Sequence, residues 1–298
     1  MPKQSTNHVL LIRPAEFFSN DQTALTNQYQ HSSQEKDKDK ILQEALIQFD
    51  NFEQMLKNKQ ILVTTLDGRI GCPDNIYPNW VLTFEDKTMN VFSMMAENRR
   101  LEKSENHISF LNKTYRTTID FSNFEKDSIF LEGTSSMVLD RINKIAYMGV
   151  SARSNEKLAL QWTNLNGFEL VTFETESHNG EAIYHTDLVM YIGTNLAVVS
   201  LDSVKKDYQS KVIQSLRKSH KVMKISREQV QEFCGNCIEI KDVDNNPKLL
   251  MSSAAYEAHS ERQKQTLLKY YTEIMHSNLS CIEKYGGGSA RCMVMELF

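Results

Sequence analysis

The chain has 298 residues, of which 40% are hydrophobic and 24% are charged, so it could form one large domain or two modest ones. Its net charge of −4 argues against a nucleic-acid partner, which would favour a basic face. No stretch approaches the roughly 20 apolar residues that span a bilayer, and no apolar run follows a basic segment near the start. We therefore expect a cytoplasmic protein without a membrane partner.

The first predicted elements are a strand, a polar segment and a helix. The short apolar run at 9–12 is typical of a buried strand. The polar segment 20–40 is either a surface loop or a lid over a site, and its charged end begins a helix. From Leu42 to Leu56, apolar residues recur at helical spacing, which predicts an amphipathic helix. A second strand follows at 61–64.

The rest of the chain repeats one order of elements. Strand pairs are predicted at 80–84 with 89–92, 136–139 with 145–148, and 188–192 with 196–200. Helices are predicted at 158–162, 204–216 and 260–275, and further strands at 168–173, 237–240, 249–252 and 292–297. The order strand, strand, helix, strand fits about five copies of about 60 residues, with no linker between them. The pattern alone predicts an α/β protein without a visible domain boundary.

Five cysteines are present, and an odd number without a secretory signal indicates reduced thiols. They are Cys72, Cys234, Cys237, Cys281 and Cys292. Cys234 and Cys237 form a Cys-x-x-Cys motif, which could be half of a zinc site or a redox pair. Tetrahedral zinc needs four ligands, and no second motif supplies them, so metal binding is disfavoured.

The most informative stretch is the C-terminal run that contains three consecutive glycines, Gly286 to Gly288, and then Cys292. Three glycines remove every side chain from a turn, so that backbone or a ligand can approach closely. Cys292 is therefore well placed to present its sulfur to a pocket. The alternative is a half-buried cysteine on a terminal strand, because free cysteine is among the most buried residue types.

Three earlier runs join this cysteine in chain order: ENRRLE at 97–102, FLEGT at 130–134 and YHTD at 184–187. Together they resemble the guanidino-group-modifying (pentein) superfamily, which includes arginine deiminase, dimethylarginine dimethylaminohydrolase and the amidinotransferases. Within it, the chain is most similar to the bacterial citrulline-utilisation hydrolases, also called citrulline ureidases. The resemblance begins at residues 9–14 and extends to Cys292.

This resemblance implies a five-fold pseudo-symmetric α/β propeller, one catalytic domain over residues 1–298, with the active site in a central channel. It also implies a hydrolase without a cofactor, in which Cys292 attacks the substrate carbon and forms a covalent intermediate. His185 would protonate the departing nitrogen and then activate water, and Glu132 would hold His185 in position. Taken alone, His185 could be a structural residue and Glu132 could cap a turn.

The resemblance also assigns substrate-binding residues. Asp187 follows His185 by two positions, so both lie on one side if the segment is extended, and it matches an acid that binds guanidinium. Arg99 and Arg153 match two arginines that grip an α-carboxylate, although Arg153 could instead be a surface charge. Asn79 stands where related enzymes have a second acid. A ureido oxygen needs a donor, which an amide provides and a carboxylate does not, so Asn79 favours citrulline.

The sequence therefore predicts hydrolysis of the ureido bond of citrulline or a close relative to ornithine, ammonia and carbon dioxide. A deiminase or amidinotransferase that acts on an arginine-like substrate is the alternative within enzymes. A non-catalytic propeller, like the ribosome anti-association factors, is the alternative in another class, but it gives no reason for Cys292, His185 and Glu132 to occur together. The oligomeric state stays open.

Overall fold

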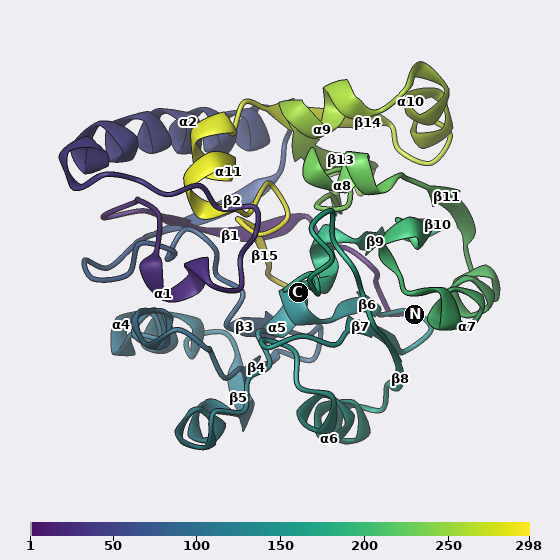
Figure 1. Ribbon diagram of the computed structural model, residues 1–298, viewed down its shortest axis with the longest axis horizontal. Coiled ribbons are helices and arrows are strands. Elements are labelled where there is room, and N and C mark those ends of the chain that lie inside the picture. Colours follow the sequence, from purple (N-terminus) through teal and green to yellow (C-terminus); the bar gives the residue numbers. More distant parts are fainter. Residues whose placement is uncertain (1) are drawn as a thin grey trace.

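Residues 2–298, which the computed structural model describes, form five three-stranded sheets arranged in a ring, with helices on the outside (Figure 1). Each sheet contains one antiparallel pair and one parallel pair, and a helical connection joins the two parallel strands. This arrangement confirms the predicted α/β propeller of five strand–strand–helix–strand units.

The strands are grouped here by sheet. They are β15 (Met295–Glu296), β1 (His8–Arg13) and β2 (Leu62–Asp67); β3 (Val81–Thr83), β4 (Thr88–Val91) and β5 (Arg116–Asp120); β6 (Val138–Asp140), β7 (Ile145–Gly149) and β8 (Glu169–Phe173); β9 (Met190–Ile192), β10 (Leu196–Val199) and β11 (Lys221–Lys224); β12 (Ile238–Lys241), β13 (Pro247–Ser252) and β14 (Glu273–Ser277).

The helices lie mostly between the parallel strands. They are α1 (Asp21–Ala24), α2 (Lys38–Asn58), α3 (Glu97–Arg100), α4 (Glu105–Leu111), α5 (Gly133–Ser136), α6 (Glu156–Asn166), α7 (Lys206–Arg217), α8 (Arg227–Gln231), α9 (Ser253–Ala258), α10 (Glu261–Leu267) and α11 (Ser280–Gly286). Short 3-10 helices are η1 (Glu35–Asp37), η2 (Ser122–Asp127), η3 (Thr186–Leu188) and η4 (Leu201–Ser203).

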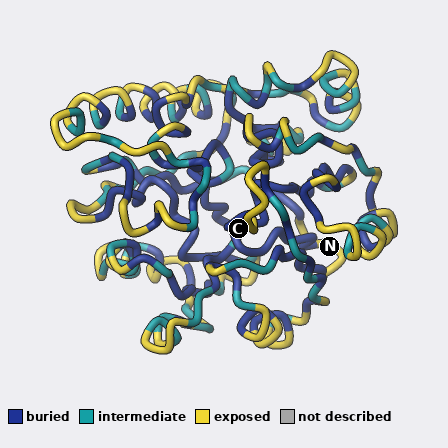
Figure 2. The backbone as a smooth tube through the Cα atoms, viewed as in Figure 1, coloured by how far each residue is buried: buried dark blue, intermediate teal, exposed yellow. Residues whose placement is uncertain are grey.

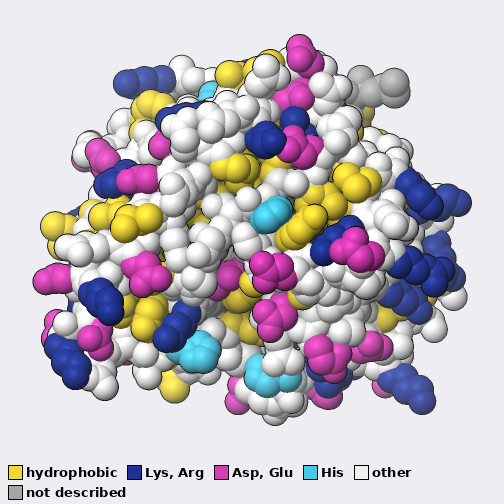
Figure 3. All heavy atoms as spheres, turned by 90° about the horizontal axis from the view of Figure 1, so that it is seen from above, with side chains coloured by type: hydrophobic (Ala, Val, Ile, Leu, Met, Phe, Trp, Pro, Cys, Tyr) yellow, Lys and Arg dark blue, Asp and Glu magenta, His cyan; other side chains and the backbone are white. Residues whose placement is uncertain are grey.

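Helix α2 shows how the sequence pattern produces this layered arrangement. Its apolar residues recur every three or four positions and are buried against the strands: Ile41, Ala45, Phe49, Phe52 and Leu56. Buried Gln48 contacts α11, and much of the remaining surface of α2 faces solvent. Figure 2 shows the same division for the whole ring, with buried strands inside and exposed helical faces outside. On the face drawn in Figure 3, acidic and basic side chains are interspersed with apolar ones.

The two ends of the chain tie the ring together. β15 pairs antiparallel with β1, with Val9 opposite Glu296, so the last strand completes the first sheet. Near the N-terminus, buried Gln4 donates to the carbonyl oxygens of Leu139 and Ile192, at 2.8 and 3.1 Å. These contacts link the third and fourth sheets.

Two predicted elements differ from the structure. The helix predicted at 260–275 ends at Leu267, and residues 273–277 form β14, which pairs parallel with β13. Leu267 and Tyr271 are both buried, but on two different elements. The strand predicted at 292–297 is only Met295–Glu296, and Cys292 lies in the preceding turn. Within residues 2–298, no helix combines the length and hydrophobicity needed to cross a membrane.

Candidate active site

A small cavity is lined by most of the site residues that the sequence predicts. It is lined by Asn27, Asp74, Tyr77, Asn79, Arg99, Arg153, Tyr184, His185, Gly286, Gly288 and Cys292. Glu132 and Asp187 contact two of these residues, His185 and Cys292 respectively. The fold therefore brings all seven predicted residues together from segments far apart in the chain.

Glu132 is a fully buried carboxylate at the centre of a cationic cluster. Its Oε2 lies 2.8 Å from His185 Nε2, 3.6 Å from Arg99 Nη1 and 3.8 Å from Arg153 Nη1. Its Oε1 accepts a hydrogen bond from the backbone of Met95. Burial disfavours the ionised form, but Arg153, His185 and Arg99 outweigh burial and lower the pKa of Glu132 to about 2. Glu132 is therefore a fixed negative charge.

The contact with Glu132 fixes the tautomer of His185. An ionised carboxylate only accepts hydrogen bonds, so Nε2 must carry the proton and Nδ1 is left to exchange one with a ligand. Burial lowers the pKa of His185, against the opposing effect of Glu132. The imidazole is therefore neutral at pH 7 before a ligand binds. The ring of Tyr184 packs 4.5 Å away, which restrains its orientation.

Cys292 is buried beside Asp187. Its Sγ donates to Asp187 Oδ2 at 3.5 Å. Burial, together with the charge of Asp187, raises the pKa of the Cys292 thiol, which is protonated before a ligand binds. The segment after His185 is not extended, since it forms η3, yet this turn still directs Asp187 to the sulfur.

Asn79 is held by Arg99. Arg99 Nη2 donates to Asn79 Oδ1 at 2.8 Å and to the carbonyl oxygen of Tyr77 at 2.7 Å. Glu102 accepts from Arg99 Nε at 2.9 Å and from Nη2 at 3.1 Å, which forms a buried bidentate ion pair. The structure thus places Arg99 in the cavity wall, with most of its hydrogen-bonding capacity already used.

Arg153 is engaged by the polar segment that follows β1. Its Nη2 donates to Thr26 Oγ1 at 2.6 Å and to the carbonyl oxygen of Thr23 at 3.0 Å. Asn27, in the same segment, lines the cavity and donates to the carbonyl oxygen of Gly286 at 3.0 Å. Of the segment 20–40, the first part therefore lies against the site, and the last residues begin α2.

The three glycines make room for side chains that approach the turn. A Cβ at Gly286 would lie 2.1 Å from Tyr77 Oη, which is impossible without movement. At Gly287, φ is +64° and a Cβ would meet Asn27 at 2.5 Å. Tyr184 Oη donates to the carbonyl oxygen of Gly287 at 2.5 Å. The turn that precedes Cys292 is thus fixed by residues of the cavity wall.

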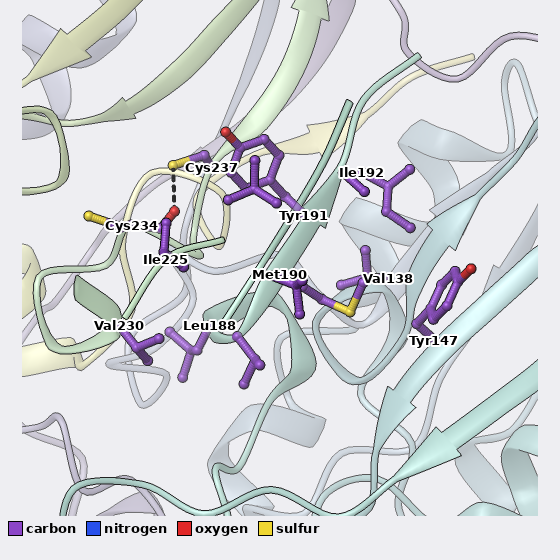
Figure 4. Packing of buried hydrophobic residues seen from close by; sticks show 14 of the residues in the cluster. Val138, Tyr147, Leu188, Met190, Tyr191, Ile192, Ile225, Val230, Cys234 and Cys237 are labelled. Atoms are coloured by element: carbon purple, nitrogen blue, oxygen red, sulfur yellow. Dashed lines mark hydrogen bonds between the residues drawn. The ribbon is translucent and has the colours of Figure 1, made fainter. Parts of the chain in front are cut away.

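The Cys-x-x-Cys motif lies in the hydrophobic core (Figure 4). Cys234 Sγ donates to the carbonyl oxygen of Ala255, and Cys237 Sγ donates to that of Cys234, at 3.4 and 3.3 Å. Burial raises the pKa of Cys234 to about 12. Among residues 2–298, no group of three or more His, Cys, Asp or Glu side chains could hold a metal ion.

The sequence did not reveal several buried residues of this site, among them Asn27 and Tyr77 of the cavity wall. Asp74 lines the cavity, and its Oδ1 has no hydrogen-bond partner within residues 2–298. Glu102 pairs with Arg99, and Asn236 contacts Cys292. Glu102 stands in the ENRRLE run three positions after Arg99, a spacing that predicts contact between the two side chains if the run is helical; in the structure Glu102 lies in the turn after α3. For Asp74 and Asn236 no such local signal exists.

The chain matches a family model described as N,N dimethylarginine dimethylhydrolase, eukaryotic, over residues 13–298. The chain belongs to this family. The dimethylarginine dimethylhydrolases are guanidino-modifying enzymes of the pentein superfamily, so the predicted superfamily is confirmed, as is a hydrolase that acts on C–N bonds other than peptide bonds. No curated protein matches the chain.

Solved structures share the dimethylarginine dimethylhydrolase fold. The substrate-bound N-terminal domain of ArgZ, an arginine dihydrolase of the ornithine–ammonia cycle in cyanobacteria, has a TM-score of 0.77 at 16% identity and covers 97% of both chains. A complex of AgrE with L-arginine has a TM-score of 0.77 at 16% identity over 98% of this chain and 40% of AgrE. A dimethylarginine dimethylaminohydrolase adduct has a TM-score of 0.66 at 18% identity over 100% of both chains. At these identities the likeness shows the fold alone.

Proposed function

We propose that this protein is a cysteine hydrolase that cleaves the ureido C–N bond of citrulline or a closely related amino acid. This proposal rests on the orientation of the side-chain amide of Asn79. Arg99 can only donate, so the Asn79 atom that faces it is the oxygen, and the Nδ2 hydrogens remain for a ligand. Nδ2 makes no hydrogen bond within residues 2–298. A ureido oxygen would accept from it, whereas a guanidinium presents only donors.

A guanidino substrate is the second candidate, and Asp187 favours it. Asp187 Oδ1 is buried without a hydrogen-bond partner in the described residues, and a cationic guanidinium would satisfy it. ArgZ is an arginine dihydrolase, and AgrE binds L-arginine, which supports the same candidate. Asp74 does not discriminate, because its unpaired oxygen suits the α-ammonium group that citrulline and arginine share. Asn79 and Asp187 thus favour different substrates.

The α-carboxylate of the amino acid would bind Arg153 rather than Arg99. In the structure Arg153 donates to neutral oxygens of Thr23 and Thr26. Exchanging them for a carboxylate strengthens the hydrogen bonds, because charge-assisted bonds are stronger than neutral ones. Arg99 already has a carboxylate partner in Glu102, so it gains nothing from the exchange. Binding would require residues 23–26 to move away from Arg153.

The first half of the reaction joins the substrate carbon to Cys292. His185 Nδ1 takes the thiol proton, Sγ bonds to the ureido carbon, and the carbonyl π electrons move to oxygen beside Asn79. When the carbonyl reforms, the bond to the terminal nitrogen breaks, and His185 returns the proton so that ammonia leaves. A thiocarbamate remains on Cys292.

The second half consumes one water. Neutral His185 takes a proton from the water, whose oxygen attacks the thiocarbamate carbon, and the proton returns to sulfur as the C–S bond breaks. The released carbamate loses carbon dioxide and leaves ornithine. One citrulline and one water thus give ornithine, ammonia and carbon dioxide. The charge of Glu132 stabilises each transient imidazolium.

A screen for the release of ammonia and methylamines from citrulline, arginine, agmatine and methylated arginines tests the proposal, with ornithine and citrulline measured by mass spectrometry. Citrulline should give equal amounts of ammonia and ornithine, and Cys292→Ser should give neither. Hydrolysis of arginine or methylarginines alone would favour the second candidate. A folded wild-type protein that hydrolyses none of them would contradict both and support a binding role.

A further inference from the structure

A buried amide, Asn236, contacts the sulfur of Cys292. Asn236 is fully buried, and its Nδ2 lies 3.1 Å from Cys292 Sγ. The same Nδ2 donates to the carbonyl oxygen of Asp187 at 3.2 Å, and Oδ1 accepts from the backbone N–H of Cys292 at 3.3 Å. A further bond joins the backbone N–H of Arg291 to the carbonyl oxygen of Asn236. The side chain of Asn236 therefore contacts both Cys292, the proposed nucleophile, and Asp187 beside it.

These contacts determine which end of the amide faces the sulfur. The backbone N–H of Cys292 only donates, and the carbonyl of Asp187 only accepts, so Oδ1 must face the first and Nδ2 the second. Nδ2 is then also the atom beside Sγ. On another side of the sulfur, Asp187 Oδ2 accepts the thiol proton at 3.5 Å. The sulfur thus has an acceptor for its proton and a donor for its lone pair.

We propose that Asn236 is a further catalytic residue of this enzyme: its amide N–H holds the sulfur of Cys292 in position and stabilises the thiolate that attacks the substrate. The inference rests on the proposed role of Cys292 as the nucleophile. A hydrogen bond to sulfur strengthens when the sulfur becomes charged, so Asn236 stabilises the thiolate more than the thiol. Besides burial, the charge of Asp187 raises the pKa of the Cys292 thiol, whereas Asn236 and Arg291 lower it.

The proposed role of Asn236 explains why a Cys-x-x-Cys motif occurs at residues 234–237. A Cβ at Gly235 would lie 2.0 Å from the carbonyl oxygen of Leu188, so only glycine allows the loop to pack against the turn that carries Asp187. Cys237, on the other side of Asn236, is anchored in the core by its hydrogen bond to the carbonyl oxygen of Cys234 (Figure 4). The motif holds Asn236 against Asp187 and Cys292.

The test measures the rate at which iodoacetamide alkylates Cys292 as a function of pH, in the wild type and in two variants. Asn236→Asp keeps an acceptor for the backbone of Cys292 but replaces the N–H donor, and Asn236→Ala removes both. Losing a hydrogen bond to the charged thiolate should raise the pKa of the Cys292 thiol by about one to two units, which makes alkylation about 10 to 100-fold slower at neutral pH. The loss should be larger for Asn236→Asp, whose carboxylate repels the thiolate.

Asn90→Asp is the matched control. Asn90 is also fully buried, and its amide bonds Thr118 Oγ1 and Trp162 Nε1, both at 2.9 Å, away from the cavity. This variant should keep the alkylation profile of the wild type even if its stability falls. Unchanged alkylation in a folded Asn236→Asp or Asn236→Ala protein would overturn the inference.

A second measurement does not depend on the folding of either variant. In the wild type, the side-chain amide signals of Asn236 in a ¹H–¹⁵N NMR spectrum should move as Cys292 titrates, and they should stay fixed in Cys292→Ser. An amide that does not respond in the wild type would overturn the inference. Both measurements work without turnover. The proposed function fails separately, if the wild type releases no ammonia or if Cys292→Ser stays active.

Discussion

Replacing Asn79 by aspartate should change the substrate preference of this enzyme. Arg99 Nη2 lies 2.8 Å from Asn79 Oδ1, and a carboxylate oxygen accepts the same hydrogen bond. The variant therefore keeps the anchor that positions residue 79 and should fold. It loses the Nδ2 hydrogens, which are the only donors that this side chain offers to a ligand.

The magnitude follows from one lost hydrogen bond. In the variant, a buried ureido oxygen would face a carboxylate without a donor, at a cost of about 1–3 kcal/mol. A guanidinium would instead gain an opposite charge, partly offset because Arg99 already neutralises the new carboxylate. We expect the ratio of kcat/KM for arginine to that for citrulline to rise at least about tenfold, which corresponds to about 1.4 kcal/mol.

The assay compares kcat/KM for citrulline and arginine in the wild type, in Asn79→Asp and in a control. Asn75→Asp is a suitable control. Asn75 is fully buried in the same loop, its Oδ1 accepts a hydrogen bond from the backbone N–H of Arg69 at 2.8 Å, and it does not line the cavity. The control should leave the ratio unchanged. If Asn79→Asp lowers both values equally, Asn79 does not contact the substrate's ureido group, and the preference for citrulline loses its physical basis.

Further predictions concern the nucleophile, the two arginines and Glu132. Cys292→Ser should abolish turnover and leave the free energy of unfolding within about 1 kcal/mol, as a denaturant titration would show; residual turnover would exclude the covalent mechanism. Arg153→Ala should lower kcat/KM far more for citrulline than for a decarboxylated analogue. Arg99→Ala should lower kcat/KM for both compounds, because it releases Asn79. The reverse pattern would show that Arg99 binds the α-carboxylate of the substrate. The native state lowers the pKa of Glu132 from 4.5 to about 2, so its contribution to stability is fully present above pH 4.5 and is lost as the pH falls toward 2. Acid titrations should show a flatter decline for Glu132→Gln in this window, and parallel curves would contradict the cationic cluster.

Local patterns predicted most of the ring because each sheet is built largely from neighbouring segments. The hairpins and α2 carry strong periodic signals, and the structure has them with shifted ends. The strands that the sequence misses are outer strands of their sheets: β5, β11 and β14. The predicted helix at 260–275 extends into β14, because the pairing of β14 with β13 has no local signature. β5 reads RTTID, and three of its five residues are polar and exposed, so its apolar signal is weak.

The candidate site was predictable only in part, for a related reason. Cys292 and His185 stand in runs that resemble a known family, so the motifs identified them. The partners of these residues come from elsewhere in the ring: Asn236 precedes β12, and Asp74 lies in the loop after β2. An isolated Asn or Asp in a loop is ordinary, and only the folded arrangement shows that each has an unusual environment.

The pairing of β15 with β1 connects the folding of this ring to the assembly of its active site. These two strands lie nearly the whole chain apart, and contacts of such separation carry the largest loop-closure entropy, so we expect them to form late. The other four sheets can assemble from adjacent segments beforehand. Cys292 stands just before β15, so it reaches Asp187 only when the ring closes. An incompletely folded chain therefore carries its helices and most of its sheets without an assembled reaction centre.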